Sequence, residues 1–350
     1  MIEIVKIDNA AEFDAFVASS PKGHMMQASA WGKVKNNWSW RGIISRDESG
    51  SIKGVCAILL RKMPMMPWSM MYAPRGPVCD LDDEETVTEL LTAAREYGIK
   101  NKAYAFTIDT DALVTNEKYT SLLEKLGFTF KDRNADYNTI QSRYIFRLPL
   151  NGENEEEAMM LIHPKARNAV RYAIKNNVEI VEKGIESVEE FHRIMVITGE
   201  RDNFATRGPE YFRRVMEAYG ENARICFAYY EGEAIGCTLH VLYGDKVWWL
   251  YGASSNSHRK LQPNYLLQWE AIKWSISKGC RYYDLRGGYP DENNPLHGIF
   301  VFKKKFCPEY MEFMGEADLI INKLGFFAVN FAQKMLKKTK KIRAKIINRK

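Results

Sequence analysis

Three consecutive lysines, Lys303 to Lys305, lie between Phe302 and Phe306 in the segment HGIFVFKKKF. Positive charge beside a reaction centre can stabilise the negative charge that develops in a transition state. Charged residues in a row more often form a solvated turn at the protein surface. Both interpretations fit the residue types, so the elements around the lysines have to decide between them.

Other side chains that could do chemistry follow predicted strands. Asp109 and Asp284 each end an apolar, aromatic run. A carboxylate that takes a proton from an ammonium group needs a raised pKa, and therefore partial burial. An aspartate in this place more often caps the next turn, so both roles stay open. Arg75 could contact a phosphate or an acidic neighbour, and His297 could transfer protons or be structural.

The elements that must position these residues occur twice in the chain. Each copy has a strand, a second strand with a tyrosine, a helix, and a third strand that ends at an aspartate. Tyr72 and Asp109 are 37 residues apart, and Tyr251 and Asp284 are 33 residues apart. The matching segments are residues 51–63, 69–78, 83–101 and 103–111, and residues 232–245, 247–255, 264–280 and 281–288.

This order of elements resembles the acyl-CoA N-acyltransferase (GNAT) fold. We therefore predict a mixed α/β (α+β) protein with two tandem GNAT-like domains, residues 1–148 and 149–316, and a polar linker near residues 148–158. Residues 141–150 are predicted to pair antiparallel with the strand that follows Gly127. A basic C-terminal helix within residues 317–350 is predicted to pack on the first domain.

The usual coenzyme of this fold is not expected here. A GNAT domain binds the pyrophosphate of coenzyme A through N–H groups of a glycine-rich loop at a helix N-terminus. The corresponding residues, Arg259 to Asn264, include no glycine, and Pro263 has no N–H to donate. The histidines and cysteines form no metal-binding motif, so we predict neither coenzyme A nor a bound metal ion.

The net charge of +6 comes from the end of the chain. Nine basic residues and no acidic residue lie between Lys334 and Lys350, while the rest has 41 basic and 44 acidic residues. Such a tail suits tRNA phosphates or an anionic membrane surface, and a solvated helix is the alternative. Scattered cysteines and the lack of a long apolar run predict a cytoplasmic protein with reduced thiols.

Five segments resemble motifs of the FemABX family, the aminoacyltransferases that build peptidoglycan interpeptide bridges, also called lipid II glycyltransferases. The resemblance extends from Gln27 to Asp318 and implies two tandem GNAT-like domains. Residues 163–191 contain no long insertion, so the chain resembles the members that lack a helical arm. The segments are QASAWGKVKNNWSW, YAPRGPVCD, YGASSNSHRKLQPNYLLQWEAIKW, GCRYYDLRGG and HGIFVFKKKF.

The resemblance implies roles for particular residues. Lys303 matches a lysine that stabilises the developing oxyanion or the tRNA end, and Phe302 would pack the site. A glycine is usual where Lys305 stands, which leaves open which lysine points inward. The remaining candidates are Asp109 as general base, and Lys35, Arg207, Tyr211, Tyr251 and Arg75 as binding residues for the precursor. Lys33 competes with Lys35 for this role.

The activity that the resemblance implies is transfer of glycine, alanine or serine from aminoacyl-tRNA to an amine of a peptidoglycan stem peptide. The acceptor would be UDP-MurNAc-pentapeptide or lipid II, with tRNA bound only transiently and peripheral contact with the inner membrane surface. Two alternatives stay open: an N-acyltransferase that uses another donor such as acyl-CoA, and a non-catalytic protein that binds tRNA or membrane.

Overall fold

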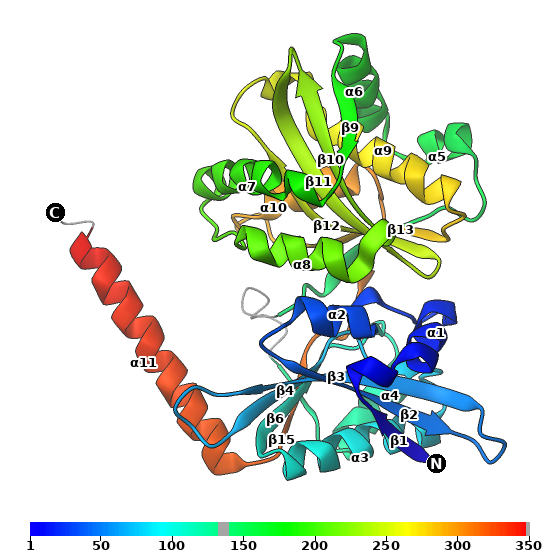
Figure 1. Cartoon of the computed structure of the whole chain (residues 1–350), viewed down its shortest axis with the longest axis vertical. Helices are drawn as coiled ribbons and strands as arrows, with labels where there is room; N and C mark the ends of the chain where they lie inside the picture. Colours follow the sequence, from blue (N-terminus) through cyan, green and yellow to red (C-terminus); the bar gives the residue numbers. More distant parts are fainter. Residues whose placement is uncertain (132–139, 348–350) are drawn as a thin grey trace.

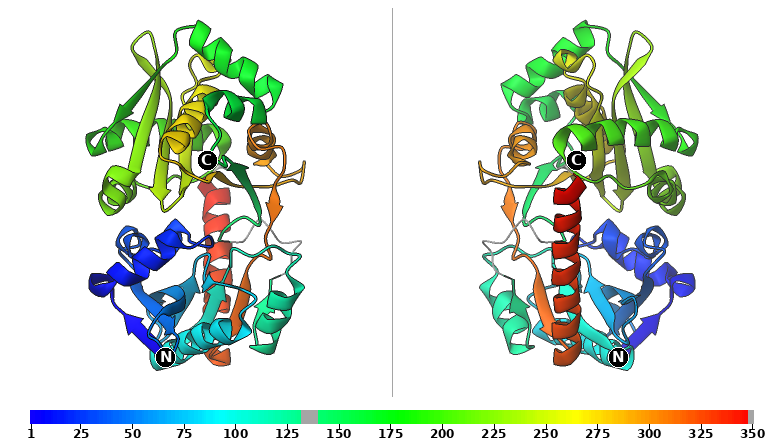
Figure 2. Two further views of the ribbon diagram at one scale, coloured as in Figure 1. Left: turned by 90° about the vertical axis from the view of Figure 1, so that its right-hand side faces the viewer. Right: turned by 90° about the vertical axis from the view of Figure 1, so that its left-hand side faces the viewer.

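The computed structural model describes residues 1–131 and 140–347, with side chains described as far as Leu336. Two mixed sheets of eight and seven strands lie end to end, each covered by helices (Figures 1 and 2). The mixed α/β fold predicted from the sequence is confirmed. No helix in the described ranges combines the length and the apolar character that a membrane span requires.

The first sheet has the strand order β1-β2-β3-β4-β6-β15-β7, with β5 paired to β3. All strands of this sheet except β15, and the helices α1 to α4, come from the N-terminal part of the chain. Their bounds are β1 Ile2–Val5, α1 Ala11–Ser19, α2 Ser29–Val34, β2 Ser39–Arg46, β3 Ile52–Lys62, β4 Ser69–Ala73, β5 Val78–Cys79, α3 Glu84–Lys100, β6 Ala103–Ile108, α4 Glu117–Lys125 and β7 Thr129–Phe130.

The second sheet has the strand order β14-β8-β13-β12-β11-β10-β9. The elements of this unit run from β8 to β14, and two further elements follow them. The bounds are β8 Tyr144–Pro149, α5 Glu155–Leu161, α6 Pro164–Lys175, β9 Glu179–Lys183, α7 Val188–Asp202, α8 Pro209–Tyr219, β10 Ala223–Tyr230, β11 Glu233–Tyr243, β12 Lys246–Ser254, α9 Pro263–Ser277, β13 Tyr282–Gly288, α10 His297–Lys304, β14 Met311–Glu312, β15 Ala317–Ile320 and α11 Lys323–Ile347.

The repeat read from the sequence is present in the structure. In the first copy β3 pairs antiparallel with β4, and β4 pairs parallel with β6 after the crossover helix α3. In the second copy β11, β12 and β13 repeat this pattern around α9. Each crossover helix buries an apolar face on its own sheet, as with Leu90 and Leu91 of α3 and Leu267 and Ile272 of α9.

The two sheets exchange strands, which corrects one prediction. Residues 144–149 do not pair with β7; β8 pairs antiparallel with β13 of the second sheet. The place beside β7 is taken by β15, which comes from the end of the chain and lies between β6 and β7. An alternating apolar pattern fixes which face of a strand is buried but not which edge it joins. The predicted domain limits, 1–148 and 149–316, stay a prediction, because strand pairing alone does not define folding units.

The residues predicted as a polar linker, near 148–158, include regular secondary structure. These residues form the end of β8, a loop and the start of α5, all within the second unit. β7 of the first sheet ends at Phe130, and β8 of the second sheet begins at Tyr144. The polar composition of residues 150–154 reflects a surface loop between a strand and a helix, which has the same composition as a linker.

One continuous apolar core joins the two units. Trp31 and Trp40 of the first unit belong to the same buried cluster as Phe212 and Leu239 of the second. The α2 helix packs on α8, and the hydroxyl of Tyr219 donates a hydrogen bond of 2.8 Å to the main-chain oxygen of Met25. The units are therefore held against each other by core packing, and residues at their junction have fixed relative positions.

The last helix, α11, starts on the first sheet and then leaves it. Phe326 and the fully buried Val329 pack against Tyr104 and Ala105 of β6. A side chain at Gly325 would have its Cβ 2.9 Å from the ring of Trp68, so the helix approaches closely here. Figure 1 shows that the later turns of α11 extend away from both sheets.

Candidate active site

Lys303 is the lysine of the three that points into the protein. It is 6 % exposed, while Lys304 is exposed and Lys305 is half-buried. The Lys303 ammonium donates a hydrogen bond of 2.7 Å to the main-chain oxygen of Gly287 and lies 5.0 Å from the ring centre of Trp249. Burial, together with the charge of Arg286, lowers the pKa of Lys303 to about 7.

The helical setting of the lysines explains which one is buried. The three lysines lie at the C-terminal end of α10 and not in a turn between strands. Phe300 and Lys303 are the buried residues of this helix. A spacing of three places these two side chains on one face of the helix. The Lys305 ammonium instead donates to the hydroxyl of Tyr265, at 2.8 Å.

Phe302 lies in a group of aromatic rings next to the lysine. Its ring centre is 4.9 Å from Tyr265, 5.3 Å from Phe306 and 6.1 Å from Trp249. Trp249 is thus in contact with both Phe302 and the Lys303 ammonium. Such a wall excludes water from the amine and strengthens electrostatic interactions there.

Asp109 is buried at the end of β6, where both of its carboxylate oxygens accept hydrogen bonds. One accepts from the hydroxyl of Tyr72 and the other from the main-chain N–H of Arg75, each at 2.7 Å. Burial raises the pKa of Asp109 to about 6, against the opposing effect of the Arg75 charge. The structure therefore combines a capping contact with the raised pKa that a general base needs.

Lys35, Arg207, Tyr211 and Tyr251 come together at the junction of the two units. The Lys35 ammonium lies 5.5 Å from the Tyr211 ring centre, and the guanidinium of Arg207 lies at the same distance from that ring. The rings of Tyr211 and Tyr251 are 6.0 Å apart. Burial, followed by the charge of Arg207, lowers the pKa of Lys35 to about 8.

Two further details concern the elements that carry this group. Arg207 precedes α8, which begins at Pro209, so it reaches Tyr211 from a loop and not from the same helix. The competing Lys33 is exposed, whereas Lys35 ends α2 and packs 4.9 Å from the ring centre of Trp31. Lys35 is thus the lysine of this pair that contacts Tyr211.

Arg286 is the residue that the sequence reasoning missed. Its positive charge lowers the pKa values of both Lys303 and Lys35. A bulge in β13 between Asp284 and Arg286 positions it, with a φ angle of 60° that non-glycine residues seldom adopt. The sequence signal was the arginine in DLRGG, within a segment singled out for its aspartate and as one of the five motifs, but not for this residue.

Asp284 and His297 have structural partners. Asp284 is the third residue of β13 and not its end, and its carboxylate accepts from Arg147 at 2.8 Å and from the main-chain N–H of Arg286 at 2.6 Å. His297 stacks on Phe300 with ring centres 5.7 Å apart, and its Nδ1 lies 3.2 Å from the main-chain oxygen of Tyr289. The contacts of both side chains are accounted for by a structural role.

The N-terminus of α9, where the fold would hold a pyrophosphate, has an unusual start. Gln262 precedes the helix with a φ angle of 60°, and Pro263 is its first residue. A side chain therefore stands where the fold normally has glycine, and one N–H is missing. Within the described ranges no group of three or more His, Cys, Asp or Glu residues could hold a metal ion.

Comparison with known proteins assigns the family. The FemAB family matches residues 9–233 and 230–334, which together make up most of the chain. The chain belongs to the FemAB family. Its relatives include proteins described as lipid II:glycine glycyltransferase from Staphylococcus epidermidis and Staphylococcus aureus (strain MRSA252). Both are 28 % identical to it over 94 % of the chain, covering 95 % and 96 % of the relatives.

Solved structures agree with this FemAB assignment. The crystal structure of FemX is 26 % identical, covers 94 % of this chain and 99 % of its own, and superposes with a TM-score of 0.85. A tandem GNAT protein of the clavulanic acid pathway has a TM-score of 0.55 at 10 % identity, which shows the fold alone. The FemABX membership and the GNAT-like fold predicted from the sequence are confirmed.

Proposed function

We propose that this FemAB-family protein transfers an amino acid of the glycine, alanine or serine class from aminoacyl-tRNA to an amine of a peptidoglycan stem peptide. Its relatives described as lipid II:glycine glycyltransferase support transfer to a cell-wall precursor. The observation that carries the proposal is Lys303, an amine buried beside aromatic rings with a pKa lowered to about 7.

The proposed reaction needs positioning, loss of an amine proton and charge stabilisation. The acceptor amine nitrogen attacks the carbonyl carbon of the aminoacyl ester, and the carbonyl oxygen becomes an oxyanion. The C–O bond to the tRNA ribose then breaks, the amide remains, and the amine proton reaches the leaving ribose oxygen through the enzyme or water. The ester is already activated, so no covalent enzyme intermediate is required. One well-placed oxyanion donor contributes about 3–4 kcal/mol, and we assign this role to Lys303 with Phe302 as its packing partner.

Asp109 is our candidate for the general base that takes the proton of the incoming ammonium. A pKa of about 6 is close enough to neutrality for this role. Because Tyr72 and the N–H of Arg75 already occupy its oxygens, Asp109 also orients both of them. The two contributions can be separated by substitution with asparagine, which keeps the size and loses the charge.

We assign binding of the acceptor to the group at the junction of the units. Lys35 and Arg207 supply positive charge for the phosphates of UDP-MurNAc-pentapeptide or lipid II, while Tyr211 and Tyr251 form the wall beside them. Arg75, buried under the same junction, completes the proposed binding residues. The charge of Arg286 adds to the positive charge around Lys35, whose pKa it lowers.

We also propose that α11 brings the protein to the inner membrane surface, where a lipid-linked acceptor resides. Leu324, Phe327 and Phe331 are each more than two-thirds exposed, at spacings of three and four. Val329 on the opposite face is buried, so this stripe faces away from the sheet. The nine basic residues from Lys334 onward complement anionic lipid headgroups. The exposed apolar rings favour lipid over tRNA, whose phosphates need charge alone.

An in vitro transfer assay tests the function. Purified protein is mixed with a panel of charged tRNAs and with UDP-MurNAc-pentapeptide or lipid II, and the amide product is detected by mass spectrometry. We expect product with at least one small amino acid. Absence of product with every charged tRNA, or product only with acyl-CoA, contradicts the proposal.

A further inference from the structure

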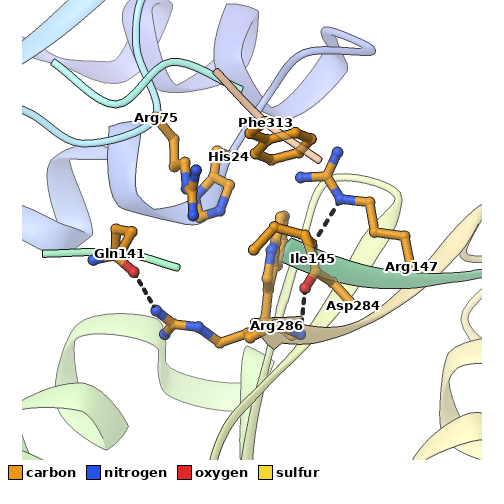
Figure 3. A pocket seen from close by; sticks show the side chains of 9 residues that line it. His24, Arg75, Gln141, Ile145, Arg147, Asp284, Arg286 and Phe313 are labelled. Atoms are coloured by element: carbon orange, nitrogen blue, oxygen red, sulfur yellow. Dashed lines mark hydrogen bonds and ion pairs between the residues drawn. The ribbon is translucent and has the colours of Figure 1, made fainter. Parts of the chain in front are cut away.

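A small cavity of about 10 Å³ lies where the two units meet, with room for one water-sized atom. His24 and Arg75 reach it from the first unit, and Arg147, Asp284 and Arg286 reach it from the second (Figure 3). Of these five residues, only Arg75 was assigned above to precursor binding. We call this space the junction cavity.

The junction cavity is surrounded by guanidinium groups. Arg75 is 4 % exposed, and its side chain donates only to main-chain oxygens, of Ser142 at 2.9 Å and of Asp109 at 3.4 Å. Arg286 donates from its side chain to the amide oxygen of Gln141 at 2.6 Å. Among the residues that the structure describes, no carboxylate forms an ion pair with the guanidinium of Arg75 or Arg286.

The nearest carboxylates already accept hydrogen bonds from other donors. Asp284 lines the junction cavity, but its oxygens accept from Arg147 and from the main-chain N–H of Arg286. Arg147 also pairs with Asp111, which holds the pKa of Asp111 below its usual range despite burial. Asp109 faces the main-chain N–H of Arg75. The side-chain N–H groups of Arg75 and Arg286 thus donate to main-chain and amide oxygens and not to these carboxylates.

Two neutral groups add hydrogen-bond donors. Trp248 lines the cavity at 1 % exposure, and its Nε1 is a buried donor without a hydrogen-bond partner among the described residues. His24 accepts from the N–H of Met26 through Nδ1, and burial holds its pKa well below the usual value. A neutral imidazole that accepts through Nδ1 carries its proton on Nε2, so His24 is also a donor there. Buried donors without acceptors are costly unless a ligand satisfies them.

We propose that the junction cavity binds a single small anionic atom and that this anion links the two units. The ligand is either a free halide ion or one oxygen of an anionic group of the acceptor; a cavity of this size holds one such atom. Its donors are Arg75 and His24 on one side and Arg286 and Trp248 on the other. An anion here would also offset the repulsion that Arg286 exerts on Lys303.

Halide binding tests the first source without substrate. The melting temperature of the full-length protein is measured while gluconate is replaced by chloride or bromide at constant ionic strength. We expect a saturable rise, because a ligand that binds only the folded state stabilises it. Arg286→Gln and Trp248→Phe should weaken the apparent halide affinity by about tenfold or more.

Two substitutions serve as matched controls. Trp40→Phe removes another buried indole Nε1 without a described partner, in the core of the first unit, and Arg193→Gln removes an exposed charge of α7. Both should keep the wild-type halide response, even if they change the melting temperature itself. Bromide-soaked wild-type crystals give a test that does not depend on variants: an anomalous peak within hydrogen-bond distance of Arg75 and Arg286.

Acceptor binding tests the second source and rests on the proposed function. UDP-MurNAc-pentapeptide is titrated at low and high chloride with ionic strength held constant by gluconate. Competition by chloride, lost in Arg286→Gln, identifies the acceptor as the source of the anion, and halide binding without competition identifies the free ion. The inference is overturned if the wild type shows no saturable halide response, no bromide peak and no competition. That result would leave the transfer activity unaffected, so the two proposals fail separately.

Discussion

The ammonium of Lys303 donates a 2.7 Å hydrogen bond to the main-chain oxygen of Gly287. This contact joins the end of α10 to the end of β13, immediately after the bulge that carries Arg286. The amine is thereby fixed between a carbonyl oxygen and the Trp249 ring, close to a second cation. A buried lysine in such a setting responds strongly to substitution and to pH.

Replacing Lys303 by methionine should separate turnover from binding. Lys303→Met keeps an unbranched side chain but removes the charge, so we expect kcat to fall by about 100-fold or more, with acceptor affinity within about twofold. Steady-state kinetics and calorimetric titration of the acceptor measure the two effects. Lys304→Met, at the exposed neighbouring position, should behave as wild type. Equal losses of turnover and affinity would contradict the oxyanion role.

The pH dependence of the reaction should report the lysine. If protonated Lys303 stabilises the oxyanion, kcat falls as pH rises through about 7, because burial and Arg286 lower its pKa to that value. Arg286→Gln removes a repelling charge and should shift this limb to higher pH. A profile that rises through pH 7 would instead assign Lys303 to proton uptake.

The same pKa affects stability. Lys303 has a pKa of about 7 in the folded chain and about 10.5 when unperturbed, so the unfolded state binds more protons between these values. The contribution of Lys303 to the free energy of unfolding therefore increases with pH from about 7 to about 10.5. Urea unfolding at several pH values should show this increase in wild type and its absence in Lys303→Met.

Lys35 and Arg207 should determine acceptor affinity. We expect Lys35→Met and Arg207→Gln each to weaken binding of UDP-MurNAc-pentapeptide by about tenfold or more, since each removes a charge-assisted contact to phosphate. Turnover at saturating acceptor should change much less. Lys33→Met is the control, because Lys33 is exposed on the same helix. Similar losses in Lys33→Met would show that only the overall positive charge of this surface matters.

Substitution of Asp109 should distinguish base from cap. Asp109→Asn keeps one acceptor for Tyr72 or the Arg75 N–H but cannot take a proton at neutral pH. As general base, Asp109 predicts a loss in kcat of about 100-fold or more and disappearance of a rising limb near pH 6. A variant that melts at a lower temperature but retains its pH profile would leave Asp109 with the structural role only.

Membrane contact should depend on the exposed rings of α11. Phe327→Ser together with Phe331→Ser should reduce sedimentation of the protein with phosphatidylglycerol vesicles by about tenfold or more. The double variant lacks the two aromatic side chains that would insert into the membrane interface. Neutral phosphatidylcholine vesicles should bind weakly in every case. Ile99→Ser, at an exposed apolar residue of α3, is the control. Unchanged sedimentation of the double variant would assign binding to the basic residues alone.

The sequence by itself determined the repeated architecture and the family. Alternating apolar strands, the crossover helices and the spacing from Tyr72 to Asp109 and from Tyr251 to Asp284 reflect local patterns, which a chain carries in its residue order. A shared binding role for Lys35, Arg207 and Tyr211 was anticipated only through resemblance to known relatives. No local rule relates Lys35 to the other two, which lie far along the chain.

Only the tertiary structure decided which strands exchange and which charges meet. The pairing of β8 with β13 and of β15 with β6 joins segments more than a hundred residues apart, and the alternation of a strand is the same for any partner. The orientation of α10 on its sheet buries Lys303 and not the other two lysines. The bulge that positions Arg286 depends on a pairing register between β8 and β13. Such geometry follows from the packed assembly of distant segments, so it could not be read from the residues alone.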